Sequence, residues 1–168
     1  MKTAIIFTDM FFERYTSMGD TEKINEMKQT LSDNAGRNWT DTIERMKNAN
    51  TFSYYNHLIY DEISPDYCRM HLDIAPESRN PEGNVHGGCY FGLADSCAGG
   101  VARSDGNIWV SLDASCNFLR SVAEGRITAI GKTKRRGNTV CVVDVELFDE
   151  SERLLFSAVF SLFKVTKR

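Results

Sequence analysis

Apolar and polar residues alternate along several stretches of the chain from residue 51 onward. Between residues 139 and 148, Val143, Val145 and Leu147 alternate with two acidic residues. A period of two places successive side chains on opposite faces of a strand. By this pattern and the turn residues between the stretches, strands are predicted at residues 58–63, 66–74, 108–118, 126–135, 139–148 and 154–165.

A helix is predicted between the second and third of these strands, at residues 86–103, which read HGGCYFGLADSCAGGVAR. This segment holds five glycines, and each costs an isolated helix about 1 kcal/mol relative to alanine. Glycine is useful in a helix where another backbone comes too close for a side chain. We therefore predict an α+β domain in which a mostly antiparallel sheet wraps around one long helix.

The first 50 residues differ in composition from the rest. They are polar, charged and free of proline, and residues 21–34 and 39–49 each carry apolar residues at helical spacing. We expect residues 1–50 to form an N-terminal helical extension and residues 51–168 to form a single domain.

Composition and charge narrow the class of protein. The 168 residues are 42% hydrophobic and 26% charged, which is typical of a globular protein rather than a disordered chain. Uncharged runs fall far short of the ~20 apolar residues that a membrane helix needs. The net charge of -3 gives no basic field to attract nucleic acid. We expect neither nucleic acid nor a membrane as partner.

The cysteines argue for a reducing environment. There are five, an odd number, with no CxxC pair and no histidine at metal-ligand spacing. We expect free thiols, no metal site and no disulfide framework. The apolar run at residues 4–7 is too short for a signal-peptide core, so we expect a cytoplasmic protein.

Asp95 is the candidate for chemistry. It lies in the middle of the predicted helix, and its neighbours one turn away are all apolar or glycine. A carboxylate partly removed from water suits a general base or a nucleophile; a buried structural carboxylate is the alternative. Gly87 and Gly88 stand where the first N–H groups of the helix have no partner, and such groups can stabilise an oxyanion.

These residues belong to a longer motif. Residues 80–88 read NPEGNVHGG, residues 93–95 read LAD, and residues 115–121 read SCNFLRS. Over about residues 51–166 the chain resembles the hotdog-fold acyl-CoA thioesterases of the phenylacetate-pathway (PaaI) type. The resemblance implies a hotdog fold, with five or six antiparallel strands curled around the helix at residues 86–103.

The resemblance also implies roles for the motif residues. Asp95 matches the catalytic carboxylate, and Gly87 matches the residue whose N–H binds the oxyanion, with Gly88 as a candidate second donor. Asn80 matches an amide that helps to hold the thioester carbonyl or the water. His86 matches the motif histidine, which we interpret as mainly structural at the helix start.

Two further expectations come from the same resemblance. Ser111 aligns with a serine or threonine that helps to orient water in some members, and Asp113 is a weaker candidate close by. The site of such enzymes forms across a two-fold dimer, with Asp95 of one copy facing the motif amides of the other. We therefore expect a homodimer or a dimer of dimers.

Substrate contacts are predicted at two places. Lys132, Lys134, Arg135 and Arg136 cluster at one strand end, where Arg135 and Arg136 are candidates to bind the coenzyme A phosphates; a solvated hairpin tip is the alternative. Phe118 is a candidate to line a substrate channel, with core packing as the alternative.

The predicted function is hydrolysis of an acyl-CoA thioester to a free acid and coenzyme A. The resemblance implies no metal or redox cofactor, because coenzyme A enters as part of the substrate. Two alternatives stay open, since a fold does not fix a function: a non-catalytic acyl-CoA binding or sensing protein, and a hydratase acting on an enoyl-CoA.

Overall fold

The structure is a computed structural model that describes Met46 and residues 50–165. The helices predicted at residues 21–34 and 39–49 lie outside the described residues, apart from Met46, which is helical and buried. The N-terminal extension therefore stays a prediction.

Six antiparallel strands form one sheet in the order β1-β2-β4-β5-β6-β3. Their bounds are β1 (Ile59–Ser64), β2 (Tyr67–Asp73), β3 (Ile108–Phe118), β4 (Arg126–Arg136), β5 (Val140–Phe148) and β6 (Leu154–Val165). Each predicted strand is confirmed to within one residue at either end. β3 and β1 form the two edges of the sheet.

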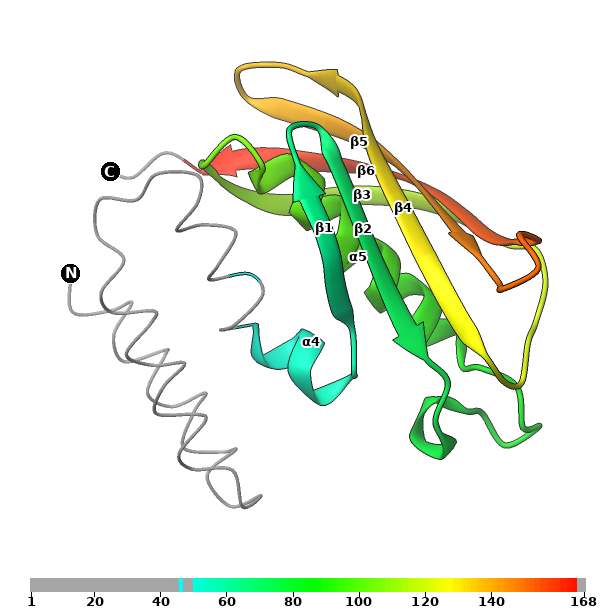
Figure 1. The fold of residues 1–168 in the computed structure, drawn as a ribbon. Coiled ribbons are helices and arrows are strands. Elements are labelled where there is room, and N and C mark those ends of the chain that lie inside the picture. Colours follow the sequence, from blue (N-terminus) through cyan, green and yellow to red (C-terminus); the bar gives the residue numbers. More distant parts are fainter. Residues whose placement is uncertain (1–45, 47–49, 166–168) are drawn as a thin grey trace, which may run out of the picture.

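The predicted helix is α5 (Gly87–Arg103), and the sheet curls around it so that it contacts every strand (Figure 1). The approach is too close for side chains at two glycines. A Cβ at Gly100 would lie 2.5 Å from the Cys68 sulfur, and a Cβ at Gly131 would lie 2.9 Å from the Cys97 sulfur. This packing confirms the predicted α+β hotdog arrangement and its reason for glycine.

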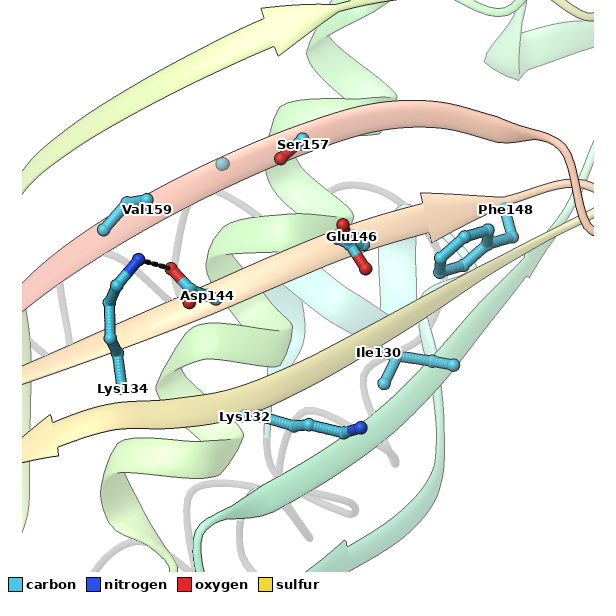
Figure 2. A pocket seen from close by; sticks show the side chains of 9 residues that line it. Ile130, Lys132, Lys134, Asp144, Glu146, Phe148, Ser157 and Val159 are labelled. Atoms are coloured by element: carbon cyan, nitrogen blue, oxygen red, sulfur yellow. Dashed lines mark hydrogen bonds and ion pairs between the residues drawn. The ribbon is translucent and has the colours of Figure 1, made fainter.

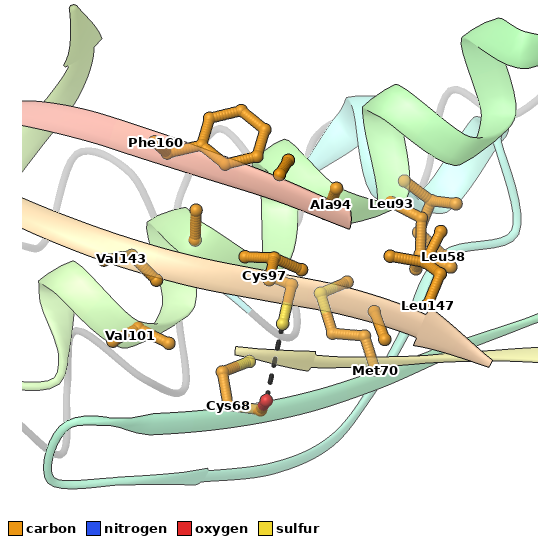
Figure 3. Packing of buried hydrophobic residues seen from close by; sticks show 14 of the residues in the cluster. Leu58, Cys68, Met70, Leu93, Ala94, Cys97, Val101, Val143, Leu147 and Phe160 are labelled. Carbon is orange, nitrogen blue, oxygen red and sulfur yellow. Dashed lines mark hydrogen bonds between the residues drawn. The ribbon is translucent and has the colours of Figure 1, made fainter. Parts of the chain in front are cut away.

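The core lies between α5 and the concave face of the sheet (Figure 3). Cys97 and Val101 of α5 meet Met70 of β2 and Val143 of β5, and all four are fully buried. The Cys97 thiol donates a hydrogen bond to the carbonyl oxygen of Cys68 at 3.4 Å. No disulfide bond joins any of the five cysteines, all of which lie in the described part of the chain.

Two short helices were not predicted. α4 (Thr51–Tyr55) begins after Asn50, whose side-chain oxygen accepts a hydrogen bond from the Ser53 N–H at 3.1 Å. A 3-10 turn, η2 (Pro76–Ser78), follows β2. No helix within the described part of the chain has the length and apolar character to cross a membrane.

The edge strand β3 carries a β-bulge between Ser111 and Asp113. Ser111 pairs with Leu162 and Asp113 pairs with Ser161, so Leu112 is the extra residue. A bulge of one residue moves the following side chains to the opposite faces of the strand. This shift decides which polar side chains of β3 face α5.

Candidate active site

Asp95 of α5 is half-buried and faces the edge strand β3. The Ser111 hydroxyl donates a hydrogen bond to one carboxylate oxygen of Asp95, Oδ1, at 2.6 Å. A hydroxyl donor at this distance fixes the orientation of a carboxylate and leaves its second oxygen as an acceptor. The structure thus brings together the predicted catalytic carboxylate and the serine predicted to assist it.

Asp113 lies on the other face of the sheet. Beyond the bulge at Leu112, Ala114 and Cys116 pack against the core, so Asp113 points outward and is exposed. The expectation that Asp113 is a weaker second candidate near Asp95 is wrong. The alternation of a regular strand would have placed it beside Ser111, and the bulge reverses that placement.

The start of α5 holds the predicted oxyanion donors. His86 is the N-cap residue, and its Nδ1 atom accepts a hydrogen bond from the Gly88 N–H at 2.8 Å. This contact supports the structural role predicted for His86 and occupies the Gly88 donor. The Gly87 N–H has no acceptor among the described residues. It therefore remains the donor available to a developing oxyanion.

Asn80 organises the loop before α5. Its side-chain oxygen accepts hydrogen bonds from the N–H groups of Glu82 at 3.1 Å and Asn84 at 3.0 Å. Gly83, with φ of +81°, allows the turn between them. Because the oxygen is used within the loop, the Asn80 side-chain NH₂ group is left to donate to a bound carbonyl or water.

Phe118 lies against the helix start. A Cβ at Gly87 would be 3.2 Å from the Phe118 ring, and that ring is 56% exposed. Phe118 also packs edge-on to Tyr90 and Phe156, with ring centroids 6.3 Å and 4.9 Å away. The exposed ring therefore forms an aromatic wall beside the predicted oxyanion donor.

Tyr90 is a part of this wall that sequence reasoning missed. Its hydroxyl donates a hydrogen bond to the Arg120 carbonyl at 3.3 Å, and burial raises the pKa of that hydroxyl. Tyr90 follows Gly87 by three residues, close to one helical turn, and this spacing was the available signal.

Arg103 was also missed, because Asp95 was compared only with residues one turn away. Arg103 follows Asp95 by eight residues on the same helix face, with Gly99 midway between them. A glycine between two charged residues at helical spacing was the signal that could have found it.

The two arginines predicted to bind the coenzyme A phosphates differ in the contacts they make within the chain. Arg136 donates hydrogen bonds to the carbonyl oxygens of Val101 and Ala102 at 2.9 Å and 2.8 Å. It also forms ion pairs with Asp66 at 2.8 Å and Asp105 at 3.1 Å. Its guanidinium therefore closes the C-terminal end of α5.

Arg135 is the freer of the two predicted phosphate ligands. Its side chain is exposed and pairs with no acidic residue in the described part of the chain. Its part in coenzyme A binding stays a prediction, as does that of Arg136.

A hollow of about 530 Å³ opens on the outer face of the sheet (Figure 2). Charged residues of both signs line it, with Lys134 and Asp144 3.1 Å apart. Lys132 and Lys134 of the predicted basic cluster line this hollow, whereas the residues predicted to be catalytic do not. It lies across the sheet from Asp95 and α5.

The two halves of the predicted site do not meet within one chain. Asp95 and Gly87 are eight residues apart on a helix that rises 1.5 Å per residue, which separates them by about 12 Å along the axis. An attacking group and an oxyanion donor must both lie within about 3 Å of one carbonyl group. Asp95 and the Gly87 N–H of one chain are therefore too far apart to act on the same carbonyl group.

Comparison with known proteins gives one family. A model of the thioesterase superfamily matches residues 82–156. Putative esterase ComA2 from Bacillus subtilis (strain 168) is 30% identical over 98 residues, which are 56% of this chain and 78% of that protein. The 1,4-dihydroxy-2-naphthoyl-CoA hydrolase of Escherichia coli (strain K12) is 29% identical over 102 residues, 59% of this chain and 75% of that protein.

Solved structures are similar as well. A hypothetical thioesterase protein with coenzyme A from Streptococcus pneumoniae TIGR4 has a TM-score of 0.63 and 28% identity, covering 66% of this chain and 88% of that one. The E. coli PaaI protein from the phenylacetic acid degradation operon has a TM-score of 0.73 over 76% of this chain and 94% of that one. At 17% identity, this second likeness concerns the fold alone.

Proposed function

Because this chain belongs to the thioesterase superfamily, we propose that it hydrolyses the thioester bond of an acyl-coenzyme A. Membership makes the chain a thioester hydrolase. The choice of coenzyme A thioesters is supported by two similar proteins, of which one is named as a CoA hydrolase and the other is seen with coenzyme A. The matched segment contains Gly87, Asp95 and Ser111.

In the proposed reaction Asp95 is the general base. Its free carboxylate oxygen takes a proton from water as the water oxygen bonds to the thioester carbonyl carbon. The carbonyl oxygen becomes an oxyanion that the Gly87 N–H stabilises, helped by the Asn80 amide. The carbon–sulfur bond then breaks, and sulfur leaves with the electron pair as the coenzyme A thiolate, which takes up a proton. Direct attack by the Asp95 carboxylate is the alternative chemistry at the same atom.

Two copies of the chain are needed in this proposal. The edge strand β3 has no neighbour on one side within the described residues, and its Val110 and Leu112 side chains are 44% and 64% exposed. An unpaired edge with exposed apolar residues favours pairing with a second chain. Such pairing brings Asp95 of one copy towards Gly87 of the other. Further pairing into a dimer of dimers stays a prediction.

Phe118 lies where the substrate would pass in this arrangement. Its exposed ring adjoins Gly87, so it would contact the groups that flank the thioester carbonyl. A flat aromatic surface beside the oxyanion donor offers apolar contact to this part of an acyl-CoA.

The hydrogen bond between Ser111 and Asp95 is the observation that carries the proposal. It identifies one carboxylate that is oriented, half-buried and unpaired with any cation within ion-pair distance in the described part of the chain. The test is a panel of acyl-CoAs in which release of the coenzyme A thiol is followed with a thiol reagent. Asp95→Asn should lower kcat by about 100-fold or more with the fold retained.

Asp113→Asn is the matched control, because it makes the same change on the face of the sheet that points away from α5 and Asp95. It should leave thiol release at the wild-type rate. If Asp95→Asn also hydrolyses a good substrate at the wild-type rate, the assignment of Asp95 fails. Stoichiometric binding of acyl-CoA with no thiol release over hours would instead indicate an acyl-CoA binding protein.

A further inference from the structure

Two exposed phenylalanine rings lie one helical turn before Asp95. Phe91 of α5 is 40% exposed and packs against the ring of Phe160, with the ring centroids 5.6 Å apart. Phe52 of α4 is 53% exposed, and a Cβ at Gly92 would lie 3.1 Å from its Cζ atom. Each ring is therefore fixed on one side by the fold and accessible on the other.

Helix geometry places the two rings on either side of Asp95. Successive residues of an α-helix are turned by about 100° around the axis. Position 91 is therefore about 40° to one side of Asp95, and position 92 is about 60° to the other side. Phe91 borders one side, and Phe52, which lies over Gly92, borders the other. The helix surface between the rings carries no side chain from Asp95 back to Gly88.

The opposite direction along α5 is occupied by a charged group. A Cβ at Gly99 would lie 2.8 Å from the Nη1 atom of Arg103, and the Nη2 atom donates a hydrogen bond to the Trp109 carbonyl at 2.5 Å. The guanidinium therefore covers the helix face that follows Asp95. An apolar group placed there would displace water from a charge without replacing its hydrogen bonds. An apolar group that points the other way meets two phenyl rings.

We propose that Phe52 and Phe91 bind the acyl group of the substrate, so that the site prefers thioesters of apolar acyl groups larger than acetyl. This inference rests on the proposed hydrolysis at Asp95. The carbonyl carbon must lie close to Asp95 for attack, so one of its two substituents can reach residues one turn away. The pantetheine arm of coenzyme A carries two amide groups, which would lose hydrogen bonds to water between aromatic rings. The apolar acyl group has no such cost.

Phe52 comes from a part of the chain that the family match does not cover, because the match begins at residue 82. α4 leads directly into β1 (Figure 1). Ser53 is buried, and its carbonyl oxygen accepts a hydrogen bond from the N–H of the buried Leu58 at 2.8 Å. These contacts hold α4, and with it the Phe52 ring, beside α5. The contact of Phe52 with the acyl group thus does not follow from family membership.

The first test compares kcat/KM for hexanoyl-CoA and acetyl-CoA, followed by thiol release. Phe52→Ala and Phe91→Ala should each lower the value for hexanoyl-CoA about 10-fold or more and the value for acetyl-CoA less than about 3-fold, because an acetyl group is too short to reach the rings. Equal losses for both substrates in folded variants overturn the proposal. Should Phe91→Ala not fold, Phe91→Leu, which keeps an apolar contact with Phe160, takes its place beside Phe52→Ala.

Phe163→Ala is the matched control. Phe163 is 41% exposed, close to the value for Phe91. It lies on the outer face of β6, since the neighbouring Leu162 is buried in the core. Its replacement removes an equally exposed ring from a surface away from Asp95 and should leave the ratio of the two kcat/KM values unchanged.

The second test does not depend on catalysis. Hexyl-CoA is a thioether with no thioester bond to hydrolyse, and its Kd is compared with that of free coenzyme A by calorimetry. The wild type should bind hexyl-CoA about 10-fold more tightly or better, since burial of each CH₂ group is favourable. Phe52→Ala and Phe91→Ala should reduce this ratio, and Phe163→Ala should keep it.

The binding ratios separate the two proposals. A wild-type ratio close to one, or a ratio that neither variant reduces, overturns the acyl contact even if the protein hydrolyses acyl-CoA. The expected ratios without thiol release from any acyl-CoA overturn the proposed hydrolysis and support the acyl contact.

Discussion

At the scale of single residues, the site depends on how each polar atom is occupied. The Ser111 hydroxyl donates a hydrogen bond to one oxygen of Asp95, and the His86 ring accepts a hydrogen bond from the Gly88 N–H. What remains is one carboxylate oxygen and the Gly87 N–H. These are the acceptor and the donor that thioester hydrolysis requires.

Two adjacent glycines should respond differently to alanine. A Cβ at Gly100 would lie 2.5 Å from the buried Cys68 sulfur, whereas a Cβ at Gly99 would meet the terminal Nη1 atom of the Arg103 side chain. Gly100→Ala should therefore lower the free energy of unfolding by about 1–3 kcal/mol, the usual range for overpacking a core.

Gly99→Ala is the matched control for that substitution. It should change the free energy of unfolding by less than about 1 kcal/mol, because alanine favours the helix and the guanidinium can shift. Urea unfolding of both variants gives the comparison. Equal losses would show that the helix–sheet distance at Gly100 is not the limiting contact.

At the scale of elements, α5 is fixed at both ends by side chains outside its core stripe. His86 caps the first turn, and Arg136 of β4 binds the carbonyl oxygens of Val101 and Ala102 in the last turn. These contacts set the direction in which α5 crosses the sheet. They thereby set where Asp95 meets β3.

Arg136→Met should destabilise the fold by about 1–3 kcal/mol, since it removes one hydrogen-bond donor from each of two carbonyl oxygens and the ion-pair partner of two carboxylates. A hydrogen bond from Thr133, joined by Arg136, holds the pKa of Asp66 below its ordinary value. A lowered pKa contributes stability above the ordinary value of about 3.9 that is lost as pH falls through the lowered one.

The difference in unfolding free energy between wild type and Arg136→Met should therefore shrink below about pH 4. Arg135→Met, at the exposed neighbouring position, should cost less than about 0.5 kcal/mol. Urea unfolding at several pH values measures both effects. A difference that does not change with pH would mean that Asp66 takes no part in the stabilisation.

How far the sequence predicts these elements depends on the strength of the local signal. The six strands and α5 were predicted because each packs one face against the core. Apolar residues therefore recur at regular spacing along each of them. Residues 51–55 had no such repeat, and the cap by Asn50 that forms α4 is a single contact. The bulge at Leu112 has no marker in the sequence, since leucine is ordinary in a regular strand. Asp113 was misplaced for that reason.

The roles within the site divide in the same way. Asp95, Ser111 and Gly87 were predicted because motif and helix position point to them, and the structure brings Asp95 and Ser111 together. The hydrogen bonds from Arg136 to the last turn of α5 were not predictable, because they depend on how the end of β4 lies beside that turn. The matches to the thioesterase superfamily and to a PaaI structure confirm the predicted family and fold.

At the scale of the whole molecule, the proposed hydrolysis requires a second copy. The helix rise places Asp95 and Gly87 about 12 Å apart in one chain, and β3 offers an unpaired edge with exposed apolar residues. In an isologous dimer each copy gives Asp95 to one site and Gly87 to the other. A chain that lacks Asp95 and a chain that lacks the Gly87 N–H can then together form one intact site.

Gly87→Pro removes the proposed oxyanion donor and fits the backbone at the start of α5, although the exposed Phe118 ring, 3.2 Å from a Cβ there, must shift slightly. Proline is well tolerated at the first helical position, and His86 has the extended backbone, φ -66° and ψ 137°, that a residue before proline prefers. Gly87→Pro and Asp95→Asn should each abolish most thiol release. Co-expression of the two variants with separate affinity tags should restore about a quarter of the wild-type activity, because about half of randomly paired dimers keep one intact site of two. Dual-tag purification should enrich that activity, whereas a mixture no more active than its two components would place Asp95 and Gly87 in one chain's own site.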